Sequence, residues 1–282
     1  MLRNYSNSRT LGDNIRLGTL TAFTAGTINI ASLLIFLSFT SNVTGHYAIL
    51  AAEISQGNWT QVAVVAGWIF LFFFGGFVSN FIVLTFNKKS KYFAHAMPIV
   101  LEIICLLTVG IYGQFFYRKT LEETEALVAL MLFATGLQNG LTASISNFSV
   151  KTTHLTGTTT DLGILFSMFI KKKFRKNAEL RGRAKLLMSI MAAYVFGAVF
   201  SGLTYYHLEF RVFYVISVCL LVVIGYDFYK INLRHYYTQY RFYKIYHKPT
   251  FIATLYYKIH NVNEKRTLSR HAPNPKLAFS DK

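Results

Sequence analysis

Charged residues are scarce in this chain, at 15% of 282 residues, where a soluble protein carries about a quarter. Hydrophobic residues instead make up 53% of the sequence and aromatic residues 16%. They gather in windows of roughly 20 residues, the length at which a helix crosses a hydrocarbon layer of ~30 Å. The scarcity of charge excludes a soluble globular domain and predicts an all-α polytopic membrane protein with six transmembrane helices. The six windows are 17–39, 62–86, 95–116, 125–147, 185–206 and 211–230.

Cysteine and the patterns of metal or nucleotide chemistry are also scarce. Cys105 and Cys219 are the two cysteines, and both lie inside apolar windows. We interpret them as small packing residues rather than a disulfide. Neither metal-ligand spacing, nor a phosphate-binding loop, nor a nucleophile elbow occurs in the sequence. We therefore predict no metal, no cofactor and no catalytic residues.

Positive charge is absent from residues 40–61 and concentrated in alternate loops. The formal net charge is +17, and most of the basic residues fall in 1–16, around 88–91, in 171–185 and in 231–282. Under the positive-inside rule these segments are cytoplasmic, so six crossings place both termini inside. We expect no nucleic-acid partner, because the charges form no folded basic face. In the aromatic and basic tail, 231–282, the part up to Ile259 suits an anionic inner leaflet, with membrane lipids as its partners.

The two halves of the chain, 17–116 and 125–230, repeat the same landmarks in the same order. Each half has a Gly-x-x-Asn motif in its first window, then a Thr-Gly pair, then a glycine in its second window. These residues are Gly26, Asn29, Thr44, Gly45 and Gly75 in the first half, and Gly136, Asn139, Thr156, Gly157 and Gly197 in the second. Each half contains three windows, an odd number, so the second half enters the membrane from the opposite side. We therefore predict a 3+3 inverted repeat, which in secondary transporters places the solute site near the repeat interface.

The stretches after the two Thr-Gly pairs, 46–56 and 158–170, are long enough for about three helical turns and too short to cross a membrane. A helix that begins at membrane depth directs unpaired N–H groups and a partial positive charge at whatever faces it. Non-helical backbone at that depth must be buried in protein or line a wet cavity. Two interpretations stay open: two short re-entrant or interfacial helices lining a cavity, or ordinary extramembrane turns capped by threonine.

Polar residues inside the windows define a candidate site. The second half of the fourth window is more polar than interhelical hydrogen bonding requires, so we interpret it as a cavity wall. Glu102 lies in the third window, where inserting a carboxylate costs roughly 2.5–3.5 kcal/mol. It is either a proton or cation coupling site or the partner of a neighbouring side chain. The predicted solute-binding residues are Asn29, Thr44, Gly45, His46, Gln138, Asn139, His154, Thr156, Gly157 and Asp161.

Five segments resemble the YoaK family, bacterial integral membrane proteins catalogued as a domain of unknown function. The resemblance covers roughly residues 15–230 and implies a multi-pass protein of the bacterial plasma membrane, with no established substrate. The chain differs from the family at Asn29, where the family commonly has Asp. The segments are AGTINIA (25–31), SNVTGH (41–46), FFGGF (73–77), GLQNG (136–140) and TTHLTGTTTDL (152–162).

The sequence therefore favours a small-solute transporter or channel subunit with a polar cavity at the repeat interface. Six spans also leave room for a homodimer that completes a pathway. One alternative is a non-transporting membrane scaffold or sensor that works through its basic tail. A membrane-embedded enzyme is a further alternative, and it requires several of four residues to meet within hydrogen-bond reach in one aqueous pocket. These four are His46, Glu53, His154 and Asp161.

Overall fold

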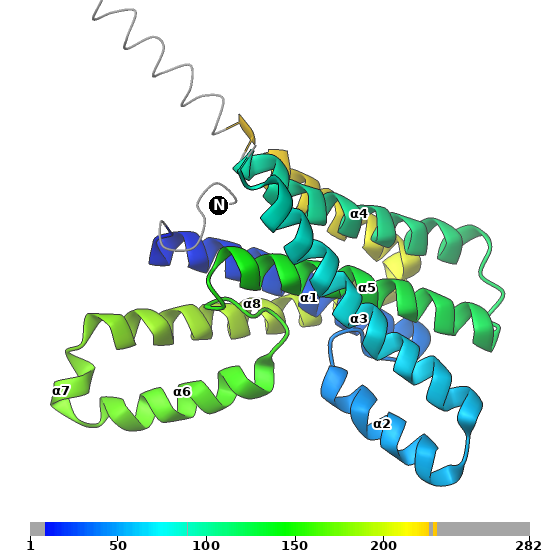
Figure 1. The fold of residues 1–282 in the computed structure, drawn as a ribbon, viewed down its shortest axis with the longest axis horizontal. Helices are drawn as coiled ribbons and strands as arrows, with labels where there is room; N and C mark the ends of the chain where they lie inside the picture. The colour runs from blue at the N-terminus through cyan, green and yellow to red at the C-terminus, as the bar shows by residue number, and fades with distance from the viewer. Residues whose placement is uncertain (1–8, 89, 226–227, 230–282) are drawn as a thin grey trace, which may run out of the picture. The chain divides into compact units, whose positions relative to one another are not determined.

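The computed structural model describes residues 9–88, 90–225 and 228–229. The chain divides into two units, Met1–Phe228 and Tyr229–Lys282, and the helices between residues 11 and 225 all belong to the first unit. The predicted tail, 231–282, lies outside the described residues. Every regular element within the described residues is helical (Figure 1). The elements are α1 (Leu11–Phe36), α2 (Val43–Gln56), α3 (Trp59–Phe86), α4 (Lys91–Phe115), α5 (Leu121–Ile145), α6 (Leu155–Phe169), α7 (Lys172–Arg175), α8 (Ala178–Leu208), the 3-10 turn η2 (Glu209–Arg211) and a last helix over 212–225.

Five helical stretches are long and apolar enough to cross a membrane: α1, α3, α4, α5 and the continuous stretch Ala178–Gly225. The last has 48 residues, which as a straight helix would be about 72 Å long and far exceed one crossing. It breaks at η2, where Glu209 has a φ of 44°. The six predicted windows thus correspond to six helical segments, and the predicted all-α polytopic membrane protein is confirmed.

After this break the chain returns along α4. A side chain at Gly113 would overlap the Phe210 ring, so that end of α4 lies against η2. Near the other end of α4, Tyr92 Oη donates a hydrogen bond of 2.9 Å to Ile224 O. Residues 212–225 therefore run antiparallel to α4.

The ends of the long helices show which way each one runs. Phe36, at the end of α1, makes edge-to-face ring contacts with Tyr117, just after α4, and with Phe210 in η2, directly after α8, at 5.7 and 5.8 Å between centroids. α1, α4 and α8 therefore finish at the same end of the unit. α5 starts at that end, because Tyr112 near the end of α4 donates a 3.0 Å hydrogen bond to Glu123 in the first turn of α5.

α3 runs parallel to α5. Gln61, near the start of α3, donates a 2.9 Å hydrogen bond to Glu125 near the start of α5. Ser144, near the end of α5, donates one of 2.7 Å to Asn80 near the end of α3. α1, α4 and α8 thus run one way, and α3, α5 and 212–225 run the other. The three helices of the first half are inverted in the second, as the odd number of windows predicts.

Glycines let a helix of one half cross a helix of the other, and the same crossing occurs twice. A side chain at Gly26 of α1 would meet the backbone of Tyr194 on α8, and one at Gly197 of α8 would meet the carbonyl of Phe23 on α1. In the second crossing, Gly75 of α3 faces the carbonyl of Phe133 on α5, and Gly136 of α5 faces the carbonyl of Phe72 on α3. The repeat equates Gly26 with Gly136 and Gly75 with Gly197, so each crossing joins a first-window glycine of one half to a second-window glycine of the other, and the two crossings are equivalent.

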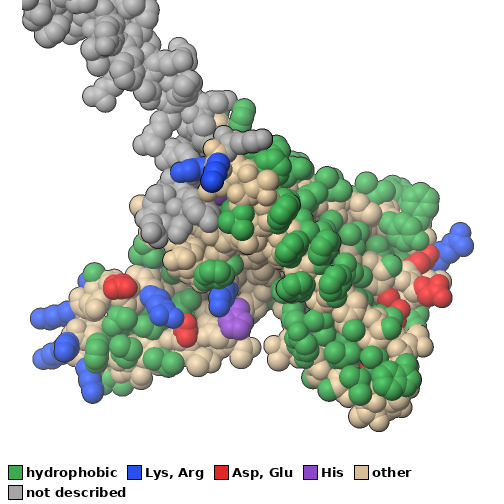
Figure 2. All heavy atoms as spheres, viewed as in Figure 1, with side chains coloured by type: hydrophobic (Ala, Val, Ile, Leu, Met, Phe, Trp, Pro, Cys, Tyr) green, Lys and Arg blue, Asp and Glu red, His purple; other side chains and the backbone are tan. Residues whose placement is uncertain are grey.

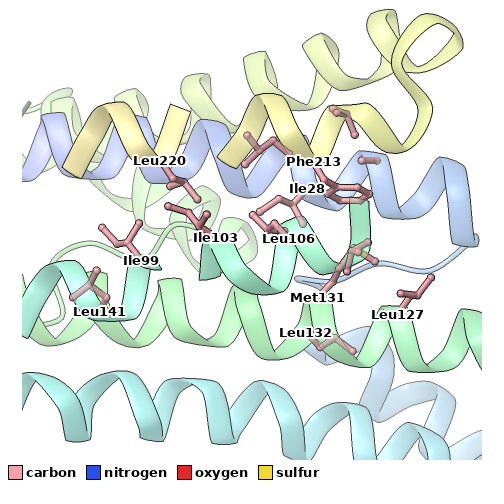
Figure 3. Close-up of a cluster of buried hydrophobic side chains, with 14 of the residues drawn as sticks. Ile28, Ile99, Ile103, Leu106, Leu127, Met131, Leu132, Leu141, Phe213 and Leu220 are labelled. Carbon is pink, nitrogen blue, oxygen red and sulfur yellow. The ribbon is translucent and has the colours of Figure 1, made fainter. Parts of the chain in front are cut away.

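The main apolar core lies between α1, α4, α5 and 212–225. Ile28, Leu106, Met131 and Phe213 are among its fully buried side chains (Figure 3). α3 instead exposes many of its aromatic side chains, as the green surface over α3 shows (Figure 2). Lys, Arg, Asp and Glu gather toward the two ends of the helices in the same view. An apolar belt between charged ends is the surface that a bilayer requires.

Candidate functional site

A cavity of about 600 Å³ lies where the two Thr-Gly segments meet. It includes Phe72 and Tyr194, which stand at the midpoints of α3 and α8, so the cavity lies half-way along these long helices. The remaining lining residues come from α1, from the segment before and into α2, and from the segment before and into α6. They are Asn29, Phe39, Ser41, Asn42, Val43, Thr44, Thr153, His154, Leu155, Thr156 and Gly157.

Most of the lining follows the repeat. Thr44 and Thr156 are equivalent, and the three residues before each of them also line the cavity. Phe72 and Tyr194 are equivalent as well, since each stands three residues before a crossing glycine, Gly75 or Gly197. The cavity is therefore built from matching positions of the two inverted halves.

Both short helices begin at this cavity and lead away from it in different directions (Figure 1). The first cap is Asn42, whose Oδ1 accepts a hydrogen bond of 3.1 Å from Gly45 N. The second is His154, whose side chain makes no capping hydrogen bond. The helices start at Val43 and Leu155, so each Thr-Gly pair lies in the first turn and not at the cap, contrary to the sequence interpretation. Asn42 already supplies the capping oxygen that the threonine was expected to supply.

The repeated asparagines hold the loops in front of the short helices. Asn29 Oδ1 accepts hydrogen bonds from Thr40 N at 3.0 Å and from Ser41 N. Asn139 donates from Nδ2 to Thr153 Oγ1 at 2.9 Å and accepts from Thr152. Each asparagine thereby satisfies polar groups of a non-helical loop, which buried backbone requires.

The polar face of α5 holds its neighbours rather than lining this cavity, to which α5 contributes no residue. Thr135 Oγ1 donates to Thr40 O at 2.8 Å. Gln138 Nε2 lies 2.7 Å from Thr24 Oγ1 and 3.0 Å from Glu102 Oε1. Gln138 and Glu102 therefore form a separate buried cluster with α1. The polar residues of α5 were expected to line a cavity. In the structure they instead form hydrogen bonds with neighbouring helices and loops.

His46 lies on the side of α2 that faces α3. Its side chain is 3% exposed, its Nε2 lies 2.9 Å from Phe39 O, and its ring meets Trp68 edge-to-face at 5.5 Å. Burial lowers the pKa of the imidazole, and the contact with the Phe39 carbonyl opposes that shift only in part. A neutral ring that donates from Nε2 to Phe39 O fits this environment. His46 does not line the cavity, and its contacts fasten α2 to α3.

A second cavity, of about 920 Å³, adjoins the first and shares His154 and Gly157 with it. Asp161 lines this second cavity and pairs with Arg183 of α8 at 2.8 Å. The two side chains are 42% and 60% exposed, so the pair contributes only ~0–1 kcal/mol. The pair joins α6 to α8 at the lining of this second cavity.

Of the four residues that an enzyme would need, His154 and Asp161 both line the 920 Å³ cavity, whereas His46 and Glu53 line neither this cavity nor the first. Glu53 accepts a 2.8 Å hydrogen bond from Asn58, whereas Asp161 pairs with Arg183, His46 packs on Trp68, and His154 lies at the cavities. Among the described residues there is also no cluster of His, Cys, Asp and Glu that could hold a metal ion.

Sequence reasoning missed Phe72, Tyr194, Ser41 and Thr153, all of which line the 600 Å³ cavity. A residue-by-residue alignment of the two halves, anchored on the Thr-Gly pairs and on the glycines of the second windows, would have shown that these residues occupy equivalent positions. The chain has 26 Phe and 18 Tyr, so no single aromatic residue stands out without that alignment.

The fold and this site define an integral membrane protein of inverted three-helix halves with two short helices meeting at a shared cavity. The chain belongs to the family described as "Protein of unknown function (DUF1275)", whose model matches residues 17–226. The YoaK family is a member of this family, so the resemblance is confirmed. No curated protein and no solved structure matched the chain.

Proposed function

We propose that this protein is a small-solute transporter or channel subunit whose solute occupies the 600 Å³ cavity. The observation that carries the proposal is the lining itself, in which equivalent residues of two inverted halves meet half-way along the long helices. Inverted-repeat transporters bind their solutes at such a place, between discontinuous helices. On this proposal α2 and α6 are re-entrant, because non-helical backbone at that depth needs a cavity to line.

The lining also limits the solute. Among the described residues, it contains no Lys, Arg, Asp or Glu, so a solute of high charge would lose its hydration without gaining a counter-charge. Phe39, Phe72 and Tyr194 offer apolar surface, whereas the amide and hydroxyl groups offer hydrogen bonds. The volume of about 600 Å³ falls in the range of sites for small organic molecules, ~300–1,000 Å³. A neutral or weakly polar organic solute fits this cavity best.

The start of α6 favours a solute that carries a carbonyl or carboxylate group at one end. The N-terminus of a helix attracts a negatively charged group by ~0.3–1 kcal/mol, or ~2 kcal/mol when partly buried. α6 lacks a side-chain cap at its start, so N–H groups of its first turn remain available to a carbonyl or carboxylate oxygen.

The second cavity supplies a route toward one face of the membrane. It shares His154 and Gly157 with the first cavity, and Arg9, Lys151 and Arg183 line it. By the positive-inside rule this face is cytoplasmic. In a bacterial plasma membrane, a solute that leaves the 600 Å³ cavity on this side would enter the cytoplasm.

The test is uptake of a broad panel of labelled small solutes by the full-length protein in liposomes. Thr156→Trp fills the cavity, and Ile164→Trp is its matched control because Ile164 is 55% exposed further along α6. We expect the wild type and Ile164→Trp to move at least one solute and Thr156→Trp to reduce that uptake to background. A wild type that moves no solute, with no solute raising its melting temperature, would refute the proposal.

The scaffold or sensor alternative predicts the reverse pattern in cells. Deleting residues 233–282 would then abolish the phenotype of the protein, whereas Asn139→Ala and Gly157→Leu would leave it unchanged. Transport through the cavity requires the two point variants to have the larger effect, because Asn139 holds the loop before α6 and Gly157 lines the cavity.

A further inference from the structure

Glu102 is a fully buried acid that the solute cavity does not use. It lies on α4 with 0% exposure. It is also the one carboxylate of the described residues within 17–36, 62–86, 95–115, 126–145, 185–208 and 212–225. Its Oε1 receives a 3.0 Å hydrogen bond from Gln138 Nε2, and its Oε2 has no hydrogen-bond partner.

Within the described stretches 17–36, 62–86, 95–115, 126–145 and 212–225, which surround or contain Glu102, there is no Lys or Arg. α1 from 17 to 36, α3 from 62 to 86 and α5 from 126 to 145 contain no titratable side chain. α4 itself contributes His95, two turns away, and Cys105, and the segment 212–225 contributes Tyr214 and Cys219. A buried carboxylate without a paired cation is costly by several kcal/mol, and a carboxylic acid avoids that cost by keeping its proton. Glu102 is therefore neutral in this closed packing.

The oxygen atoms near Glu102 suit a proton better than a metal cation. Glu102 Oε2 and Gln138 Oε1 are the two buried oxygens of this pair without a hydrogen-bond partner. A hard metal ion requires about six oxygen ligands, which two atoms cannot supply. A proton on Oε2 needs a single acceptor, and Gln138 Oε1 is an unused acceptor on the residue that already contacts Glu102.

Gln138 connects this acid to the cavity. Its Nε2 is shared between Glu102 and Thr24 of α1. The next residue, Asn139, contacts Thr152 and Thr153, and Thr153 lines the cavity in front of α6. A change of charge at Glu102 therefore alters the contact that Gln138 makes between α4, α5 and α1. Gln138 is the neighbour of Asn139, the side chain that holds the loop before α6.

We propose that Glu102 is the proton-binding site that couples proton movement to solute movement, and this coupling rests on the transport function proposed above. In the closed packing the proton stays on Oε2. When α4, α5 and α1 part, water reaches Glu102, the O–H bond breaks, both electrons remain on the carboxylate, and water carries the proton away. The new charge and its water then disfavour the closed packing until a proton returns.

The first test does not depend on transport. Infrared spectra of the purified full-length protein at neutral pH should show the carbonyl stretch of a protonated carboxylic acid, and Glu102→Gln should remove that band. Ser217→Ala is the matched control, because Ser217 is a buried polar residue that bonds within its own helix, to Phe213 O. A spectrum in which Glu102→Gln changes no protonated-acid band would overturn the proposal, whatever the protein transports.

The second test measures coupling in liposomes with a solute that the wild type moves. An imposed proton gradient should stimulate uptake by the wild type and by Ser217→Ala, and Glu102→Gln should lose that stimulation. Stimulation that survives in Glu102→Gln would overturn the proposal. If no solute is moved although the infrared band is present, the transport function and the coupling both fail, and only the protonated acid stands.

Discussion

The two glycine crossings allow a quantitative test of the inverted packing. At Gly26, Gly197, Gly75 and Gly136 an added methyl group would overlap backbone atoms of the facing helix, and backbone cannot rotate away as a side chain can. The helices must separate, a form of overpacking that costs typically ~1–3 kcal/mol. We therefore expect each of these four Gly→Ala variants to lower the free energy of unfolding by about that amount.

Gly67 and Gly202 are matched controls on α3 and α8. Neither has an atom within 4 Å of the added carbon, so Ala there meets open space. Since Ala favours a helix over Gly by about 0.8–1 kcal/mol in water, these two substitutions should be neutral or stabilising.

The assay is reversible unfolding of the purified protein in mixed micelles, followed by circular dichroism. Gly75→Ala and Gly136→Ala belong to one crossing, so a single helix displacement relieves both, and their double variant should deviate from additivity by ~0.5–3 kcal/mol. Gly75→Ala and Gly197→Ala belong to different crossings and should add within ~0.5 kcal/mol. Equal losses at all six glycines, or the same coupling in both pairs, would refute the packing of the two halves.

Three further outcomes are expected from the polar contacts. Asn29→Ala should lower stability by ~1–3 kcal/mol because it removes the acceptor of two backbone N–H groups; an unchanged melting temperature would contradict this. Asp161→Asn should change stability by at most ~1 kcal/mol, since its ion pair is exposed; a larger loss in thermal unfolding would contradict it. The melting temperature, followed by Trp68 fluorescence in a Trp59→Phe background, should fall as pH drops below ~6.5, because the unfolded His46 binds a proton at a higher pH than the folded one. His46→Gln should remove that change and His154→Gln should not.

The inverted arrangement could be predicted because its signals are local. The windows depend on apolar length alone, and the repeat depends on glycine and asparagine spacings such as Gly26 with Asn29 and Gly136 with Asn139. The structure places both of these glycines at equivalent crossings, Gly26 against α8 and Gly136 against α3. The odd number of windows in each half, together with the charges of the loops, then predicted that the second half is inverted.

The roles of Gln138 and Tyr194 could not be predicted in the same way, because they depend on which helix lies opposite. Gln138 contacts Thr24 and Glu102 from two other helices, so its amide serves a buried cluster and not the cavity. Tyr194 reaches the cavity because Gly26 and Gly197 let α1 and α8 approach closely. The start of α2 was misplaced for a local reason, since Asn42 competes with Thr44 for the capping position.

Chemical cross-linking of the two helix starts tests the central claim most directly. In a protein lacking Cys105 and Cys219, the pair Thr44→Cys and Thr156→Cys lines the shared cavity, whereas Ile164 lies further along α6 and outside its lining. A short bifunctional thiol reagent, added to native membranes, should join the first pair rapidly and leave Thr44→Cys with Ile164→Cys unlinked. Equal linking of both pairs, or no linking of Thr44→Cys with Thr156→Cys, would contradict a cavity shared by the two inverted halves.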